Sequence, residues 1–193
     1  MKKFFVDLFT DKLFLLALLG PIVALGFLSV HASEVTDLAE KVSGDNIRKT
    51  IIDLSSFQNR RWDSPTGVAA SEYIVERVKE CAKGRDDITV ELVSHRNDTM
   101  PTWIMPSVVA KMKGTGTPEE SVVIGGHLDS INHEGKKETI DIAPGADDDA
   151  SGVATALEAF CVLAKAGYKP KATIEFMAYS AEEIGLDGSR AIA

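Results

Sequence analysis

Three short clusters of acidic and histidine side chains stand out in the 193-residue chain. His127 and Asp129 follow the apolar run VVIGG, three aspartates occupy positions 147–149 in the stretch APGADDDASG, and Glu182 and Glu183 follow the run ATIEFMAYS. Holding several carboxylates side by side in an apolar neighbourhood is costly unless a cation compensates their charge. Imidazole nitrogen and carboxylate oxygen, without thiolate, are ligands typical of Zn²⁺ and, less specifically, of Mn²⁺ or Co²⁺. Together the clusters indicate a metal site.

Each cluster also has an ordinary structural interpretation. A histidine near an aspartate can lie in a turn, aspartates are favoured at a helix amino terminus, and paired glutamates are common on solvated faces. A helix start accounts for one or two of the aspartates, but not for a third between small residues. What favours the metal site is position, because the clusters are expected where strands end and ligands collect in α/β folds.

The elements that would position these clusters alternate between strand and helix. Helical spacing of apolar residues predicts helices starting at Asp45 and over residues 69–83 and 151–166, with a loop at 56–67. Strands are predicted over residues 88–95, 106–114 and 172–180, and around 122–124, where a continuous apolar run is typical of burial on both faces. This alternation predicts an α/β layered fold.

The composition separates a leader from one globular domain. Residues 13–30 carry no charge and follow Lys2 and Lys3, which is typical of a secretory signal peptide ending at Ala32, with an uncleaved anchor as the alternative. Residues 33–193 would then form the domain, secreted or periplasmic, with a membrane as partner only if the leader is retained. The net charge of −8 disfavours nucleic acid as a partner.

The two cysteines, Cys81 and Cys161, leave two alternatives open. A secreted context permits a disulfide. Both positions also lie on the apolar faces of predicted helices, where buried free thiols are common.

Three blocks of the sequence carry a family resemblance. GGHLDS, APGADDDASG and FMAYSAEEIGLDGS resemble the motif blocks of the secreted bacterial leucyl aminopeptidases with two co-catalytic zincs, which share their fold with glutamate carboxypeptidase and the transferrin receptor. Residues 54–74 are similar to the segment ahead of that family's core. The resemblance implies a mixed central sheet with helices on both faces, and hydrolysis of the N-terminal peptide bond of peptides with a free N-terminus, preferring hydrophobic residues such as leucine.

The resemblance also implies a role for each site residue. His127 would bind one zinc, Asp129 would hold its ring, Asp148 would bridge both zincs and Glu183 would bind the second. Glu182 would be the general base. The peptide bond between positions 148 and 149 would be cis.

The family has two further ligands later in its sequence, and the family's complete enzyme is expected to be a monomer. The resemblance therefore implies that this chain is an N-terminal portion of the catalytic domain, truncated at its C-terminus and weakly active or inactive alone. His95 and His133 match no motif. The alternatives are a metal-free binding or receptor module on the same fold, or another reaction of the superfamily, such as glutaminyl cyclisation or carboxypeptidase action.

Overall fold

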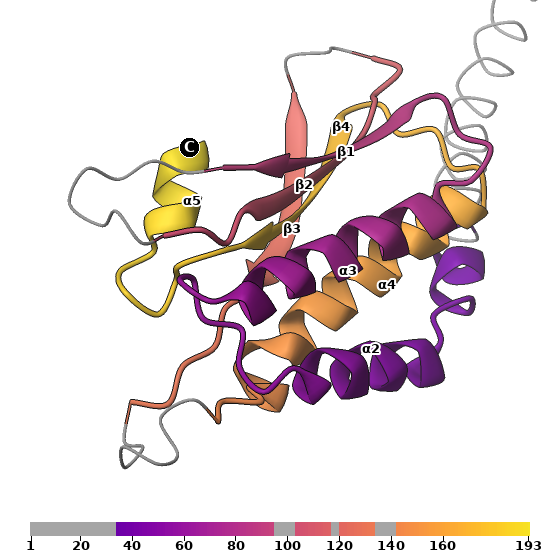
Figure 1. Cartoon of the computed structure of the whole chain (residues 1–193). Helices are drawn as coiled ribbons and strands as arrows, with labels where there is room; N and C mark the ends of the chain where they lie inside the picture. Colours follow the sequence, from indigo (N-terminus) through magenta and orange to yellow (C-terminus); the bar gives the residue numbers. More distant parts are fainter. Residues whose placement is uncertain (1–33, 95–102, 117–119, 134–141) are drawn as a thin grey trace, which may run out of the picture. The chain divides into compact units, whose positions relative to one another are not determined.

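The computed structural model describes residues 34–94, 103–116, 120–133 and 142–193 (Figure 1). The chain divides into two units at residue 41, and residues 42–193 form the larger one. The predicted leader and His95 lie outside the described residues. Among the helices that are described, none is long and apolar enough to cross a membrane.

The larger unit is built on a four-stranded mixed sheet with the strand order β1-β2-β4-β3. The strands are β1 (Ile88–Val93), β2 (Ser107–Met112), β3 (Ser121–His127) and β4 (Thr173–Tyr179). The pairs β1–β2 and β2–β4 are antiparallel, whereas β3 and β4 are parallel, with His127 opposite Tyr179. The parallel pair is what matters for function, because its two strands end at the same edge.

Helices α3 (Pro65–Cys81) and α4 (Ser151–Lys165) cover one face of this sheet, and α2 (Gly44–Ser56) packs against α4 (Figure 1). The short helix α5 (Asp187–Ile192) adjoins the other face. Helix α3 begins earlier than the predicted residue 69. Ser64 caps it by accepting from the Gly67 N–H, and Pro65 occupies its first turn, so this Ser-Pro pair, which lies within the loop predicted at residues 56–67, instead starts a helix.

The core lies between the sheet and these helices. Alternate residues of β2 and β4 point toward the helices and are fully buried, as the period of a strand requires. The rings of Phe160 on α4 and Phe176 on β4 lie 6.0 Å apart, centroid to centroid, at the centre of this contact. The strand predicted over residues 172–180 is therefore confirmed, and it lies between β2 and β3 in the sheet.

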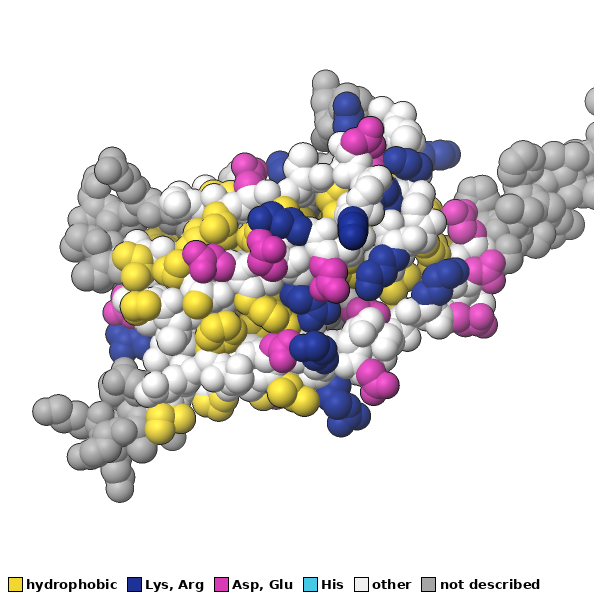
Figure 2. Space-filling view, turned by 45° about the vertical axis from the view of Figure 1, so that its right-hand side comes forward, with side chains coloured by type: hydrophobic (Ala, Val, Ile, Leu, Met, Phe, Trp, Pro, Cys, Tyr) yellow, Lys and Arg dark blue, Asp and Glu magenta, His cyan; other side chains and the backbone are white. Residues whose placement is uncertain are grey.

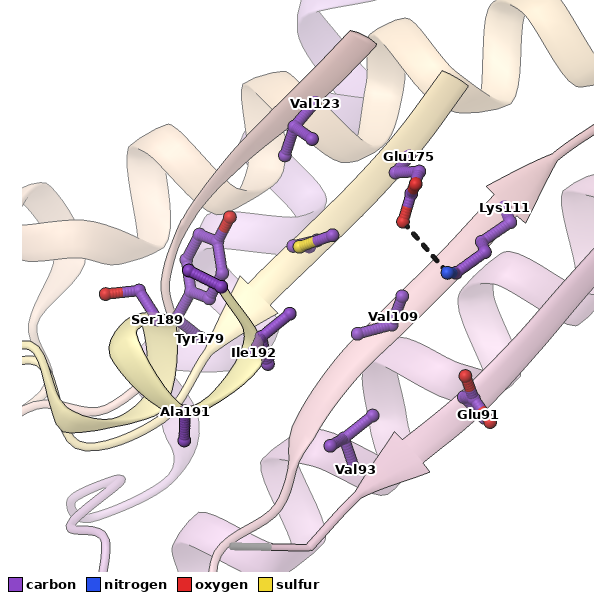
Figure 3. A pocket seen from close by; sticks show the side chains of 12 residues that line it. Glu91, Val93, Val109, Lys111, Val123, Glu175, Tyr179, Ser189, Ala191 and Ile192 are labelled. Atoms are coloured by element: carbon purple, nitrogen blue, oxygen red, sulfur yellow. Dashed lines mark ion pairs between the residues drawn. The ribbon is translucent and has the colours of Figure 1, made fainter. Parts of the chain in front are cut away.

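The expectation that the apolar run in β3 is buried on both faces is wrong. Val122 is 58% exposed and Val123 is 50% exposed, because β3 is an edge strand whose only partner is β4 within the described part of the chain. Its outer face adjoins a pocket of about 530 Å³ between the sheet and α5. Figure 3 shows this pocket, with Lys111 on β2 and Glu175 on the neighbouring β4 paired at 3.2 Å on its sheet side.

Two sets of interactions fasten the end of α4 to the end of α3. A disulfide joins Cys81 to Cys161, so of the two alternatives for the cysteines the structure has the bonded one. Arg85 donates to both carboxylate oxygens of Asp87, at 2.7 and 2.8 Å, and to the carbonyl oxygens of Ala164 and Tyr168, both at 2.8 Å. This end of the molecule is thus held both covalently and electrostatically.

Acidic, basic and hydrophobic side chains are interspersed on the face of the molecule in Figure 2. Charges of opposite sign lie close together there, so on this face the excess of acidic residues produces no large area of one sign.

Candidate metal centre

The ends of β3 and β4 bring two of the predicted clusters together. His127 is the last residue of β3, and the chain leaves β4 through a turn at Ala181, whose φ is 56°. This turn places Glu182 and Glu183 beside the end of β3. The expectation that these clusters meet at one sheet edge is therefore confirmed.

The third cluster forms a distorted helical turn, η1 (Ala146–Ala150), directly ahead of α4. The peptide bond between Asp148 and Asp149 is cis, as the resemblance implied. The Asp149 carboxylate points inward and accepts from the N–H groups of His127 at 3.2 Å and Gly152 at 2.8 Å. It therefore connects the end of β3 to the start of α4.

The small residues around this turn have a steric reason. A Cβ added to Gly126 would lie 2.4 Å from the Asp149 carboxylate, and one added to Gly152 would lie 2.2 Å from it. Both separations are shorter than real contacts. Glycine at these positions is thus required by the close approach of the backbone to Asp149.

The potential ligand atoms of His127, Asp148 and Glu183 lie within 4.8 Å of one another. Nε2 of His127 is 2.9 Å from Oδ1 of Asp148. Oε2 of Glu182 is 3.8 Å from the same Nε2, at the border of the group. The structure thus gathers four of the five predicted site side chains around one point.

Asp129, the fifth, lies behind the group and is fully buried. Its carboxylate accepts from the backbone N–H groups of Glu182 at 3.0 Å and Glu183 at 3.2 Å. The nearest approach of that carboxylate to Nδ1 of His127 is 3.7 Å, whereas the Asp129 carbonyl oxygen lies 3.1 Å from Nδ1. Asp129 thus holds the imidazole mainly through its backbone, and its side chain holds the glutamate pair.

The acidic surroundings set the charge of the imidazole. Burial lowers the pKa of His127, but the carboxylates of Asp129, Glu182 and Asp149 outweigh burial and raise this pKa from 6.5 to about 9. The metal-free imidazole therefore carries a proton at neutral pH. A metal ion must displace this proton, so its binding releases it.

Two further residues lie at the border of the group. His133, which matched no motif, has its Nε2 3.3 Å from Oε2 of Glu183. Asp147 contributes its backbone, with its carbonyl oxygen accepting from the Ser151 hydroxyl at 3.0 Å. The His133 contact spans 50 residues of sequence and does not follow from local spacing, whereas the Asp147 contact spans four residues.

The sequence reasoning missed Arg60, a fully buried arginine behind the group. Its side chain donates to the carbonyl oxygens of Leu54, Leu128, Pro144 and Gly145. Burial lowers the pKa of its guanidinium to about 10, while nearby Asp129 and Asp149 act in the opposite direction. No local signal separates Arg60 from Arg61 beside it, which is half-buried and pairs with Asp63.

The donor set fits a zinc ion. One imidazole nitrogen and two carboxylate oxygens are the ligand types of catalytic zinc sites, and such sites hold three protein ligands and an open position. His127, Asp148 and Glu183 supply both ligand types, and the side chains of Arg60 and Asp129 that support them are buried. The arrangement can hold a divalent cation, with Glu182 at its side to accept or donate a proton.

Comparison with known proteins gives concordant results. Residues 107–193 match the model of "Peptidase family M28". The chain is 39% identical over 170 residues to leucine aminopeptidase 1 of Coccidioides posadasii, with 84% of this chain and 41% of that protein covered. The alignment therefore covers most of this chain.

Solved structures agree with the sequence comparison. LapB from Legionella pneumophila superposes with a TM-score of 0.73 at 34% identity, covering 84% of this chain and 41% of LapB. The LapA aminopeptidase of the same organism has a TM-score of 0.73 at 29% identity, covering 84% of this chain and 40% of LapA. The chain therefore spans about two fifths of the length of these relatives.

Proposed function

We propose that this chain carries part of a zinc aminopeptidase site, because residues 107–193 match the model of peptidase family M28. The observation that carries the proposal is the convergence of His127, Asp148 and Glu183 within 4.8 Å. The names of the relatives, which include leucine aminopeptidase 1 and LapA aminopeptidase, support the same reaction. The proposed substrates are peptides with a free N-terminus, with hydrophobic first residues such as leucine preferred.

In this proposal His127, Asp148 and Glu183 would hold zinc, with His127 serving one ion, Glu183 a second, and Asp148 either of them. Such ions supply Lewis-acid polarisation of a peptide carbonyl and make a nearby water more acidic. Mn²⁺ or Co²⁺ would be substitutes with the same ligand types. The carboxylates of Asp148, Glu182 and Glu183 would also attract the positive amino terminus of a peptide and orient it.

Glu182 is the proposed general base. Its Oε2 lies 3.8 Å from Nε2 of His127, near enough to the metal position to reach a water there. Oε2 would take a proton from the attacking water and deliver it to the leaving amine nitrogen. The buried Asp129 would keep Glu182 in place through its bond to the Glu182 N–H.

Two neighbouring substitutions test these roles in the full-length protein. Glu182→Gln should lower kcat by about 10²–10⁴ because the proton carrier is lost, and should leave zinc content unchanged. Glu183→Gln should lower zinc content because a ligand is lost. Turnover of leucine p-nitroanilide and elemental analysis of zinc measure the two effects. If neither substitution changes zinc content or turnover, the proposal is wrong.

We also infer that the protein is exported, from the uncharged run at residues 13–30 and the small residues before Ser33. The expected mature chain begins near Ser33. Amino-terminal sequencing of secreted material checks this, and a chain that still begins at Met1 in the membrane fraction would contradict it.

A further inference from the structure

Arg60 occupies a buried position between the two backbone segments that carry His127 and Asp148. Its Nε–H donates to the carbonyl oxygen of Leu128 at 2.7 Å, and its Nη2–H donates to that of Gly145 at 3.0 Å. Its Nη1 group donates to the carbonyl oxygens of Pro144 and Leu54. One side chain thus contacts the end of α2 and both segments of the candidate metal centre.

Two of these carbonyl groups lie close along the chain to proposed metal ligands. Leu128 follows His127 directly, and Gly145 precedes Asp148 by three residues. Gly145 adopts a left-handed conformation with φ of 49°, and a Cβ there would lie 2.8 Å from Nη2 of Arg60. The guanidinium therefore fits closely against the turn from which Asp148 projects.

The backbone around Arg60 reinforces this arrangement. The Arg60 N–H donates to the Ser130 hydroxyl at 3.2 Å, and that hydroxyl donates to the Ala143 carbonyl oxygen at 2.7 Å. The Ala143 N–H in turn donates to the Gln58 carbonyl oxygen at 2.9 Å. The loop after α2 is thus bonded to the segment after β3 and to the segment before η1.

None of the four bonds from the Arg60 side chain goes to a carboxylate, although several carboxylates are near. A salt bridge from arginine would occupy the oxygens of Asp148 or Glu183 that a metal needs. We infer that Arg60 is a positioning residue, which sets the separation of His127 and Asp148 for metal binding by holding the backbone beside each. This inference rests on the proposed zinc site.

Arginine suits this task better than lysine. Its planar guanidinium presents five N–H donors in a rigid fork, so it can bond several carbonyl groups that face it from different directions. An ammonium group at the end of a flexible stem keeps the charge, but it cannot reach the same four oxygens from one position. Arg60→Lys therefore removes the geometry and retains the charge.

Arg85→Lys is a matched control. Arg85 also donates to two backbone carbonyl groups, those of Ala164 and Tyr168, but these lie at the far end of α4. Both substitutions should lower the thermal stability of the metal-free chain. Only Arg60→Lys should alter the metal centre.

The experiment measures Co²⁺ and Zn²⁺ binding to the full chain, its visible cobalt spectrum and its thermal unfolding. Weakening of an outer support typically reduces metal affinity by about 10–100-fold. We expect that loss for Arg60→Lys, with an altered cobalt spectrum, and unchanged affinity and spectrum for Arg85→Lys. Equal affinity and spectrum for the original chain and Arg60→Lys would overturn the inference.

A milder substitution decides the matter if Arg60→Lys does not fold. Ser130→Ala removes the hydroxyl that links Arg60 to Ala143 and keeps the guanidinium. It should weaken metal binding by about threefold or more, and an unchanged affinity would overturn the inference. If the original chain binds neither Co²⁺ nor Zn²⁺, the proposed function fails and the inference fails with it.

Discussion

Arg60 and Arg85 bond to the backbone near opposite ends of α4, yet they use their charge differently. Arg85 pairs with the Asp87 carboxylate through two bonds and is joined there by Lys169. Arg60 donates only to carbonyl oxygens, and it leaves the carboxylates near it without a hydrogen bond from its side chain.

This difference between the two arginines indicates that the two ends of the domain have different roles. At the Arg85 end, charges neutralise one another and a disulfide adds a covalent link, so the arrangement serves stability. At the Arg60 end, acidic side chains converge around His127, and within the described residues no bond from the Arg60 side chain goes to them. Repulsion between these carboxylates raises the free energy of the metal-free folded chain, and a bound cation removes that repulsion. The metal-centre end should therefore respond to substitution through metal affinity, and the Arg85 end through the free energy of unfolding.

The largest expected effect is on metal affinity. Asp148→Asn keeps the shape of a side chain that is 78% exposed, but removes the charge of a proposed bridging ligand. Zinc affinity should fall by about 10²–10³-fold, because a direct ligand contributes more than an outer support. The free energy of unfolding of the metal-free chain should change by less than about 0.5 kcal/mol. Titration with a zinc indicator and urea unfolding measure the two quantities.

Removal of the disulfide should lower the stability of the fold and leave zinc affinity unchanged, the opposite of the result expected for Asp148→Asn. Replacing Cys81 and Cys161 together by alanine releases a loop of 80 residues and should lower the free energy of unfolding by about 2–4 kcal/mol. Zinc affinity of the folded chain should be unchanged, because both cysteines lie away from the three ligands. A comparable loss of affinity would show that the two ends are coupled through α4.

The next effect depends on pH. Hydrogen bonds from Arg85, followed by Lys169, hold the pKa of Asp87 well below its usual value of 3.8. A lowered pKa in the folded state stabilises the fold above pH 3.8, and this contribution is lost as the pH falls through the folded value. Asp87→Asn should cost about 1–2 kcal/mol at pH 7 and should weaken the acid dependence of unfolding below pH 4. Urea unfolding between pH 2 and pH 7 tests this.

The smallest effect is expected at His133. Its side chain is 65% exposed and lies 3.3 Å from Glu183, so the pair is largely screened by water. His133→Ala should change zinc affinity by less than about threefold, well under the effect of losing a buried support. A loss as large as that of Asp148→Asn would mean that His133 is itself a ligand.

Much of the fold and of the site follows from local patterns in the sequence. Helix α4 and strand β4 were predicted within one or two residues of their observed bounds, since their apolar periodicity is strong. The resemblance pointed to His127, Asp148 and Glu183, which the structure brings within 4.8 Å. The bounds of α3 were less accurate, because Ser-Pro is typical both of a turn and of a helix start.

The exposure of β3 and the bond between the two cysteines could be learned only from the tertiary structure. The apolar residues of β3 predict burial, but sheet order places the strand at an edge, and no local pattern encodes that order. The bonding of Cys81 to Cys161 depends on the packing of α3 against α4, which brings their Cα atoms to 5.2 Å.

By itself, the sequence determined which chemical groups are present and which local elements carry them. The tertiary structure decided which way those groups point. It turned Arg60 inward while Arg61 pairs with Asp63 nearer the surface, and it used the Asp129 side chain to hold the glutamate pair. The physical reason is that a buried polar group must find its partners wherever the fold places them, and the partners of Arg60 lie up to 85 residues away in the chain.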